Sequence, residues 1–368
     1  MMKLLHICCN LAGSTVFPQL FEALAAKGLE QEVFVPEKYT SNVGKNQPKG
    51  VKTHTAMTVK KTDAIFFFRK AQRSVPEIMK RIEMETIDLI HAHTLFTDGW
   101  IAKSLAEKTG KPYAVTLRYS DIEAIWRYMP HLRPKAREIL RGAKKVVFLS
   151  PAARDKVLAT WLNAADRAAI EKKCAVIPNG IDPKWLDGCA RTGIGEPVRV
   201  GFAGLLNDRK RPLDALAAVH EANRQQSVVH FALRACGDGP LREKLTEALE
   251  ESDEYIGKIS GIAAMKEFYA GCDLLLVPST AETFGMVYLE AMSQGVPVLY
   301  TKGQGFDGQF PDGEVGFAVT AGEPQEMARW LVECAAGYGE RSARCTQHAK
   351  AYAWPTVAEK WLNLYQES

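Results

Sequence analysis

The sequence predicts an α/β protein built from two doubly wound domains, each with a parallel sheet covered by helices. Three observations support this fold class. Short, nearly continuous apolar segments alternate with helical patterns along most of the chain, which is typical of parallel strands joined by crossover helices. The alternation is interrupted near residues 178–197 and then resumes. The length of 368 residues also favours two domains, because a domain usually has about 100–200 residues.

The first half of the chain begins with an expected strand, turn and helix. Residues 3–9 form an apolar run, and a turn follows at residues 11–14. Apolar residues from Phe17 to Ala25 then recur at helical spacing until Gly28, a residue type that commonly ends a helix. Five further strands are expected in this half, at residues 33–35, 87–91, 114–117, 146–149 and 175–177.

The interruption at residues 178–197 is interpreted as a linker. It contains Pro178, Pro183 and Pro197 together with four glycines, which favour irregular structure. Six more strands are expected after it, at residues 199–203, 229–235, 255–259, 274–277, 298–300 and 317–319.

This alternation gives a domain plan. We expect a Rossmann-like domain over residues 1–182, a second one over 183–350, and a C-terminal helix over 351–368 that packs back on the first domain. Doubly wound sheets bind ligands beyond the carboxyl ends of their strands. The two domains are therefore expected to face each other across a ligand-binding cleft.

The composition excludes several classes of protein. Apolar residues make up 46% and charged residues 24%, which are values of ordinary globular proteins rather than of disordered or fibrous chains. A net charge of +4 is too small to indicate a nucleic-acid partner. No apolar run is long enough for a membrane-spanning helix, and the run after Lys3 is short for a signal peptide. The eight cysteines form no C-x-x-C pair, so we expect a cytoplasmic protein with reduced cysteines.

The strongest local pattern follows the expected strand at residues 274–277. Two glutamates, Glu282 and Glu290, are separated by seven residues in a segment expected to be helical up to about Gln294. Glu282 would lie at the helix entrance, where free N–H groups and the helix dipole favour an anion, and Glu290 would lie about two turns further on. From spacing alone, the alternative remains that Glu282 only complements the dipole and Glu290 is a solvated surface residue.

A basic loop follows the expected strand at residues 199–203. Arg209, Lys210 and Arg211 precede Pro212, a residue suited to the first turn of a helix. Cations and a helix start at the carboxyl end of a strand favour a diphosphate site. A solvated basic loop would give the same local pattern.

Two turns, Gly13–Ser14 and Gly237–Pro240, give weaker signals of a ligand site. Together with the glutamate segment and the basic loop, they resemble the retaining glycosyltransferases of the GT-B fold. The resemblance is to the family 4-like enzymes, also called glycosyl transferases group 1. The resemblance covers almost the whole chain, and its motifs occur in the family's order. The matching segments also include Ile90–His93, Val176–Asp182 and Gly295–Val298, beside Gly204–Lys210 and Glu282–Glu290 themselves.

The resemblance implies a role for each matching residue. Glu290 would bind the ribose hydroxyls of the nucleotide, Glu282 the sugar hydroxyls, and Lys210 the diphosphate. The catalytic set implied in this way is Lys210, Glu282 and Arg118. The implied donor-binding set is Gly13, Asn179, Gly204, Arg209, Lys210, Gly237, Tyr255, Ile256, Glu282, Phe284, Gly285, Met286 and Glu290.

Some of these roles belong to the backbone or to packing. Residues 284–286 would offer backbone N–H groups to the sugar and the phosphates. Tyr255 and Ile256 lie where the family packs the base, and Gly13 would let the N-terminal loop approach donor and acceptor. His91 and His93 face one side of an expected strand, but two histidines without a third ligand make a weak metal site.

The chain departs from the family pattern at two positions. The phosphate loop usually begins Gly-Arg, whereas Gly204 is followed here by Leu205, so that Arg209 or Arg211 would have to supply the charge. A histidine is common where this chain has Arg118, and an arginine binds hydroxyls or phosphate but is not a base. These departures keep a non-catalytic relative among the alternatives.

Two basic stretches with aromatic residues, 59–73 and 118–145, stand out in the first half. The first has five Lys or Arg against one acid, and the second has eight against three. They predict a surface for an anionic membrane or for a lipid-diphosphate acceptor. The alternative is an ordinary solvated surface over core aromatic residues.

The resemblance therefore implies a retaining glycosyltransferase that uses a nucleotide-diphosphate sugar, with UDP-sugars favoured. The acceptor would be a glycan or a lipid-linked molecule in cell-surface polysaccharide or glycolipid synthesis. We expect no metal, no other cofactor and no nucleic-acid partner, and a cytoplasmic location with peripheral contact to the inner face of the membrane. The alternatives are a sugar-nucleotide epimerase or hydrolase on the same fold and a non-catalytic binding subunit. A two-lobed solute-binding protein would need export, which the N-terminus argues against.

Overall fold

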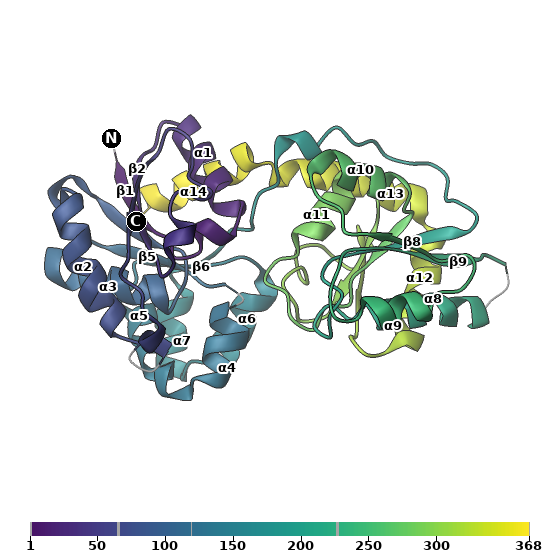
Figure 1. The fold of residues 1–368 in the computed structure, drawn as a ribbon, viewed down its shortest axis with the longest axis horizontal. Helices are drawn as coiled ribbons and strands as arrows, with labels where there is room; N and C mark the ends of the chain where they lie inside the picture. Colours follow the sequence, from purple (N-terminus) through teal and green to yellow (C-terminus); the bar gives the residue numbers. More distant parts are fainter. Residues whose placement is uncertain (1, 65–66, 119, 226–227, 368) are drawn as a thin grey trace. The chain divides into compact units, whose positions relative to one another are not determined.

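The structure is a computed structural model that describes residues 2–64, 67–118, 120–225 and 228–367 (Figure 1). The chain forms two compact units. Unit 1 comprises Met1–Leu149, Ala153–Gly180 and Trp354–Ser368, and unit 2 comprises Ser150–Ala152 and Ile181–Ala353. The divisions fall at residues 180/181 and 353/354, a few residues from the expected 182/183 and 350/351.

Unit 1 contains a parallel seven-stranded sheet with the strand order β3-β2-β1-β4-β5-β6-β7. Because the order reverses between β1 and β4, this pair marks the topological switch point, beyond which doubly wound sheets bind ligands. The strands are β1 (Lys3–Ile7), β2 (Glu30–Pro36), β3 (Lys52–Ala56), β4 (Leu89–Ala92), β5 (Tyr113–Thr116), β6 (Lys145–Phe148) and β7 (Cys174–Val176).

Helices cover both faces of this sheet, and each face has its own apolar core. Helices α1 and α14 lie side by side on one face (Figure 1), and α2, α3 and α5 contribute to the core on the other. The helices are α1 (Val16–Ala26), α2 (Arg69–Arg81), α3 (Thr97–Thr109), α4 (Trp126–Tyr128), α5 (Arg133–Gly142), α6 (Pro151–Thr160), α7 (Ala164–Glu171) and α14 (Trp354–Gln366).

The C-terminal helix α14 is an integral part of unit 1. Trp361 and Tyr365 are buried in the core that α14 shares with α1. Trp354 packs so closely on the backbone that a Cβ at Gly180 would meet its ring at 2.4 Å. A side chain at position 180 would therefore displace the start of this helix.

Unit 2 contains a parallel six-stranded sheet with the order β10-β9-β8-β11-β12-β13, and its order reverses between β8 and β11. The strands are β8 (Val198–Ala203), β9 (Phe231–Cys236), β10 (Glu254–Gly257), β11 (Leu274–Leu276), β12 (Val298–Thr301) and β13 (Gly316–Val319). The helices are α8 (Pro212–Gln225), α9 (Arg242–Glu247), α10 (Ile262–Ala270), α11 (Met286–Ser293), α12 (Pro324–Ala336) and α13 (Tyr338–Ala349).

The predicted fold class, two Rossmann-like units with doubly wound parallel sheets, is confirmed. The strand β3 was not expected, because its sequence, KTHTA, has no apolar run. Among the described residues, the helices are all too short or too polar to cross a membrane.

Candidate active site

A cavity of about 960 Å³ opens in unit 2 near the carboxyl ends of β8 and β9 and the loop that leads into α11. This volume lies at the upper end of the range of roughly 300–1,000 Å³ that is usual for small-molecule sites. The cavity brings together residues from four segments that are far apart in the sequence. The predicted residues that line it are Gly204, Lys210, Gly237, Glu282, Gly285, Met286 and Glu290.

The glycines at the cavity floor are required by the close approach of two loops. The N–H of Leu206 donates to the carbonyl of Asp238 at 3.0 Å, which joins the loop after β8 to the loop after β9. A Cβ at Gly237, whose φ is +134°, would lie 1.8 Å from the carbonyl oxygen of Gly204. A Cβ at Gly239 would lie 2.4 Å from that of Leu206. The turn therefore needs glycine for packing, whether or not a ligand is bound.

An ion pair between Lys210 and Glu282 is the main electrostatic feature of the cavity. The two side chains are 14% and 16% exposed, so the pair is largely shielded from water. Asn207 Oδ1 accepts from the backbone N–H of Lys210 at 3.0 Å, and Gln304 Oε1 accepts from that of Glu282 at 3.1 Å. Hydrogen bonds to neighbouring side chains thus fix the backbone at both charged residues.

The prediction that Glu282 lies at the helix entrance is wrong by a few residues. Helix α11 begins at Met286, and its N-cap is Gly285 with a φ of +84°. A Cβ at Gly285 would meet the ring of Tyr288 at 2.4 Å, so the glycine fixes a sharp turn into the helix. Glu282 therefore sits in the loop before this turn, which allows its side chain to reach Lys210.

Glu290 lies in the second turn of α11 and lines the same cavity. The O–H of Tyr269 donates to its Oε2 at 3.2 Å. Burial raises the pKa of Glu290 to about 7. Its carboxyl group therefore changes charge near neutral pH and has one oxygen left for a ligand hydroxyl. Glu290 is a cavity residue rather than the solvated surface residue that spacing alone allowed.

The structure does not place Arg209 and Arg211 on the cavity wall, where they were expected to replace the missing family arginine. The carbonyl of Arg209 accepts from the N–H of Thr280 at 2.9 Å, and Arg211, which precedes α8, forms an ion pair with Asp214 in the first turn of that helix. Two cations that the sequence did not single out, Arg242 and Lys258, line the cavity instead. Leu205, at the family position of the arginine, is 54% exposed.

The base-packing residues also differ from the prediction. The O–H of Tyr255 donates to the carbonyl of Gly237 at 2.8 Å, so this side chain braces the glycine turn. Ile256 is 36% exposed, and the cavity wall near the end of β10 is formed by Lys258 and Ile259. The wall residues thus lie two to four positions later in the chain than expected.

Phe284 is buried in the core of unit 2 and does not line the cavity. Its ring lies 6.0 Å from those of Phe306 and Tyr352. Of the three residues expected to offer backbone N–H groups, Gly285 and Met286 line the cavity. Phe284 therefore anchors the loop, while the two residues after it face the cavity.

Gly13, Arg118 and Asn179 belong to unit 1. The Nε–H of Arg118 donates to the carbonyl of His93 at 3.0 Å, and its guanidinium lies 4.4 Å from the ring centroid of Phe17. Asn179 Oδ1 accepts from the same side chain at 3.5 Å. A Cβ at Gly13 would meet no atom within 4 Å, so packing does not demand glycine there.

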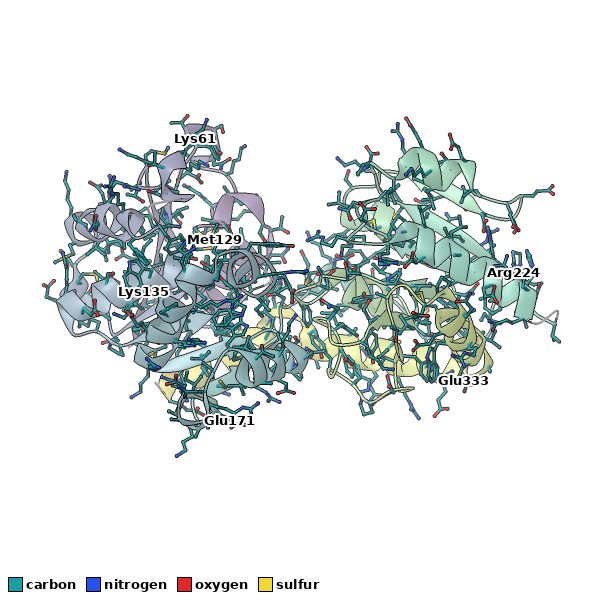
Figure 2. The ribbon with its side chains drawn as sticks, turned by 90° about the horizontal axis from the view of Figure 1, so that it is seen from below. Lys61, Met129, Lys135, Glu171, Arg224 and Glu333 are labelled. Carbon is teal, nitrogen blue, oxygen red and sulfur yellow. The ribbon has the colours of Figure 1, made fainter. Side chains whose placement is uncertain are left out.

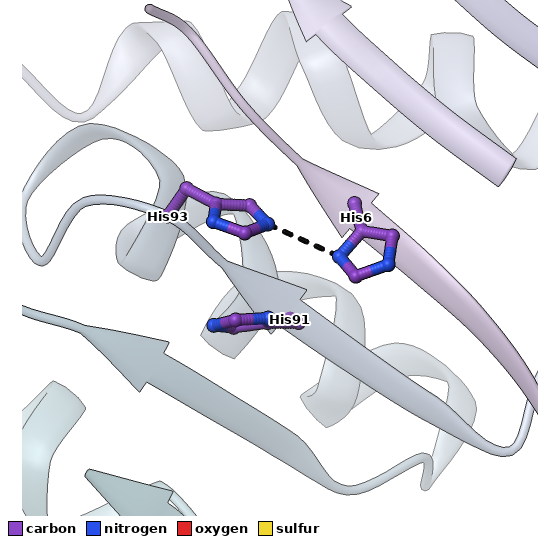
Figure 3. A group of neighbouring side chains, drawn as sticks. All are labelled: His6, His91 and His93. Atoms are coloured by element: carbon purple, nitrogen blue, oxygen red, sulfur yellow. Dashed lines mark hydrogen bonds between the residues drawn. The ribbon is translucent and has the colours of Figure 1, made fainter. Parts of the chain in front are cut away.

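Three buried histidines meet where β1 and β4 pair, as Figure 3 shows. His6 Nδ1 and His93 Nε2 are 3.1 Å apart, and the ring nitrogens of His91 are each 2.8 Å from a hydroxyl, of Tyr365 and of Thr116. Burial lowers the pKa of all three imidazoles, that of His6 to about 3. The histidines are therefore neutral at physiological pH.

The structure thus supplies the third histidine, His6, that the sequence did not indicate. A metal-bound histidine normally donates its other ring N–H to a partner. His93 Nδ1 has no hydrogen-bond partner in the described part of the chain. The set therefore fits a neutral, hydrogen-bonded cluster better than a metal centre, and the expected absence of a metal stays a prediction.

The described aromatic residues of the basic stretches 59–73 and 118–145 differ in burial, and Phe66 and Tyr119 lie outside the described residues. Phe67 is 5% exposed, and Trp126 stacks on Trp161 with 3.8 Å between ring centroids. Lys61 is exposed (Figure 2), and Tyr128 is 72% exposed. Phe68 and Trp126 pack partly buried against the apolar core of unit 1, whereas Tyr128 is exposed, and a surface for a membrane or an acceptor stays a prediction.

Two family models match successive parts of the chain. Residues 13–185 match the model described as Glycosyltransferase Family 4, and residues 197–336 match the one described as Glycosyl transferases group 1. Together the two models span most of both units.

Several curated proteins are similar in sequence. A D-inositol 3-phosphate glycosyltransferase of Corynebacterium urealyticum is 29% identical over 48% of this chain and 45% of its own length, so that match spans less than half of the relative. Another, of Paenarthrobacter aurescens, is 24% identical over 94% of this chain and 90% of its own. An uncharacterized glycosyltransferase of Methanocaldococcus jannaschii is 25% identical over 83% of this chain and 80% of its own length.

Solved structures share the fold at low sequence identity. HepE of Anabaena, in complex with UDP, is 18% identical and has a TM-score of 0.74, with both chains fully covered. Sucrose-phosphate synthase of Thermosynechococcus elongatus is 19% identical, also with a TM-score of 0.74, over 100% of this chain and 99% of its own.

Proposed function

Because the chain belongs to the group 1 glycosyltransferases of the GT-B fold, we propose that it transfers a sugar from a nucleotide-diphosphate sugar with retention at the anomeric carbon. The observation that carries this proposal is the cavity of unit 2, in which Lys210, Glu282 and Glu290 meet. One cation and two carboxylates suit a ligand that combines a diphosphate with two sets of hydroxyls.

Each of the three side chains has a distinct part in the proposed reaction. Glu290 binds the ribose hydroxyls, and Glu282 binds hydroxyls of the transferred sugar. Negative charge develops on the departing diphosphate, and Lys210 together with the backbone N–H groups of Gly285 and Met286 stabilises it. Until the donor arrives, the ion pair with Glu282 holds the ammonium of Lys210 in the cavity.

A retaining reaction at this site requires little other side-chain chemistry. The acceptor hydroxyl attacks the anomeric carbon on the face from which the diphosphate departs, and a phosphate oxygen of the leaving group takes the hydroxyl proton. Arg242 and Lys258, which line the cavity, add positive charge where Leu205 replaces the family arginine. Arg118 of unit 1 is proposed to bind the acceptor or donor in the position where the family often has histidine.

We favour UDP-sugars as donors and a glycan or lipid-linked molecule as acceptor, in the synthesis of cell-surface polysaccharide or glycolipid. HepE of Anabaena has been solved in complex with UDP and with UDP-glucose, and this supports a uridine nucleotide. The names of several relatives specify inositol 3-phosphate, so a hydroxyl-rich acceptor with a phosphate is a further candidate.

We propose that the protein works in the cytoplasm, in peripheral contact with an anionic membrane. Exposed cations of the stretches 59–73 and 118–145, among them Lys61 and Lys144, support this contact. Each Lys or Arg near such a surface contributes about 1 kcal/mol, screened by salt. Co-sedimentation with anionic vesicles should therefore weaken as salt rises, and no co-sedimentation at low salt would contradict the contact.

A non-catalytic nucleotide-sugar-binding protein is the second candidate, because Leu205 and Arg118 depart from the family pattern. The two functions differ in turnover. The purified chain is incubated with UDP-glucose, UDP-galactose and UDP-N-acetylglucosamine and with sugar, polyol and lipid-phosphate acceptors, and products are followed by proton NMR. A product whose anomeric coupling matches that of the donor supports a retaining transferase. UDP binding without turnover of any pair favours the second candidate, and an inverted product contradicts retention.

A further inference from the structure

A fully buried tyrosine contacts the carboxyl group that the proposed function assigns to the ribose. Tyr269 lies in the last turn of α10, and its O–H is 3.2 Å from Oε2 of Glu290 on α11. Of the two residues, the described lining of the donor cavity includes Glu290 but not Tyr269. The hydroxyl can therefore act on a ligand only through the groups beside it.

The Tyr269 hydroxyl has one proton and two neighbouring acceptors. One acceptor is Oε2 of Glu290, and the other is the carbonyl of Val287, at 3.4 Å in the first turn of α11. A hydrogen bond to a charged acceptor is stronger than one to a neutral acceptor. The hydroxyl therefore prefers Glu290 when that carboxyl group is ionised, and this preference weakens when the carboxyl group takes up a proton.

Residues outside the cavity fix the position of Tyr269. The guanidinium of Arg191 donates to the carbonyl of Cys272 at 2.6 Å and to that of Tyr269 at 2.9 Å. The ring of Trp185 meets the Tyr269 ring edge-on, with 6.0 Å between the ring centroids. These contacts hold the end of α10 in place, so that the phenol approaches Glu290 from a fixed direction.

The groups around Glu290 make its charge sensitive to this one hydrogen bond. Burial raises the pKa of Glu290, and the bond from Tyr269 lowers it, which gives about 7. Burial and the charge of Glu290 raise the pKa of Tyr269 well above its usual value and that of Cys236 to about 12. Both groups therefore stay neutral between pH 6 and 9. The charged residues that line the same cavity are Lys210, Asp238, Arg242, Lys258 and Glu282.

We propose that Tyr269 is a positioning residue for Glu290. Its hydroxyl holds one carboxylate oxygen, leaves the other for a ribose hydroxyl, and favours the ionised form of the carboxyl group. The part played by the ribose rests on the proposed function, whereas the action of the hydroxyl on Glu290 does not. A buried carboxyl group would otherwise be mostly protonated at neutral pH and would be a weaker acceptor.

A titration without ligand tests the action on Glu290. The carboxyl carbon of Glu290 is followed by carbon-13 NMR between pH 5 and 9, and its signal is the one that Glu290→Gln lacks. Tyr269→Phe removes only the hydroxyl and should raise the midpoint by about one pH unit, because the ionised form loses more than the neutral form does. An unchanged midpoint would overturn the inference.

Tyr288→Phe is the matched control for the loss of a buried hydroxyl. Tyr288 is also buried, lies on α11 itself, and donates its O–H to the carbonyl of Val277 at 2.7 Å rather than to Glu290. This variant should leave the midpoint of Glu290 where it is in the wild type. An equal shift in both variants would overturn the inference, because any lost hydroxyl would then have the same effect.

Isothermal titration with UDP tests the consequence for binding. At pH 7 about half of the wild type but only about a tenth of Tyr269→Phe is ionised at Glu290, so the variant should bind UDP about three- to fivefold more weakly. At pH 9 both are ionised, and their affinities should be nearly equal. A loss of the same size at both pH values would indicate a merely structural role and would overturn the inference. So would an undiminished loss when Tyr269→Phe is combined with Glu290→Gln.

Circular dichroism shows whether the variants fold. If Tyr269→Phe does not, 3-fluorotyrosine at position 269 replaces it, because the fluorinated phenol keeps its hydroxyl and is a stronger donor. The midpoint of Glu290 should then fall, and an unchanged midpoint would overturn the inference. If the wild type fails to bind UDP, the proposed function fails, and the carbon-13 titration still decides whether Tyr269 acts on Glu290. If UDP binds and Glu290 titrates alike with and without the hydroxyl, only this inference fails.

Discussion

The carboxyl group of Glu290 allows a quantitative test of donor recognition. It lines the cavity of unit 2, and its Oε2 accepts from the O–H of Tyr269 at 3.2 Å. If it binds the ribose, Glu290→Gln replaces a charge-assisted hydrogen bond with a neutral one. A bond to a charged group contributes about 1.5–3 kcal/mol. A neutral hydrogen bond contributes about 0.5–1.5 kcal/mol, so the difference of about 1–1.5 kcal/mol corresponds to UDP binding weakened by about 5–13-fold.

The raised pKa of Glu290 adds a pH signature to this prediction. With a pKa of about 7 in the empty site, the group is largely ionised at pH 8 and largely protonated at pH 6. Hydroxyl donors bind the ionised form better, so UDP binding by the wild type should weaken as the pH falls through 7. The advantage of the wild type over Glu290→Gln should shrink by up to about tenfold between pH 8 and pH 6.

Isothermal titration with two ligands and two variants completes the test. Inorganic pyrophosphate has no ribose, so Glu290→Gln should bind it as the wild type does. Glu282→Gln, which removes the partner of Lys210 and a contact to the sugar, should bind UDP at least as tightly as the wild type. Unchanged UDP affinity in Glu290→Gln, or an equal loss of pyrophosphate affinity, would refute the assignment of Glu290 to the ribose.

Three further predictions concern catalysis and stability. Lys210→Met should lower kcat by roughly 10²–10³, and near wild-type turnover in the folded variant would exclude its role at the diphosphate. Arg118→Ala should reduce kcat/KM while the circular dichroism spectrum stays unchanged, and unaltered kinetics would place Arg118 outside the site. His6 has a folded pKa of about 3, below the usual 6.5, so its contribution to stability is complete above pH 6.5 and is lost as the pH falls toward 3. The difference in unfolding free energy between the wild type and His6→Leu should fall by about 1.4 kcal/mol per pH unit below pH 6.5. Unfolding by urea is followed for both proteins. Their difference is compared because acids with raised pKa values, such as Asp98, shift the stability of both in the opposite sense and so cancel. A constant difference would contradict the neutral state of His6.

The alternation of apolar strands and helical patterns was sufficient to predict both sheets, because parallel strands buried on two faces need continuous apolar runs. The strand β3 was missed for the same reason. It lies at the sheet edge and pairs only with β2, and its sequence KTHTA is half-solvated. A search for apolar runs cannot find such a strand.

The candidate site was predicted where a motif fixes the backbone and less well where side chains from distant segments meet. Lys210 and Glu290 line one cavity, as the resemblance implied. Tyr255 was expected at the base, but its O–H reaches the carbonyl of Gly237, a contact that spacing does not show. His6 joins His91 and His93 only because β1 and β4 are neighbours in the sheet. Pairing between strands more than eighty residues apart is not readable from local patterns.

The most direct test of the central claim, that unit 2 holds the nucleotide-sugar donor, is amide hydrogen exchange followed by mass spectrometry with and without UDP-glucose. Binding should slow exchange in residues 204–210, 237–239 and 283–290, which form the loops and the helix start around the cavity. The helices α12 and α13, which lie outside the cavity lining, should exchange as in the free protein. UDP-glucose binding that leaves exchange in the cavity segments unchanged, or that slows exchange only in unit 1, would contradict the claim.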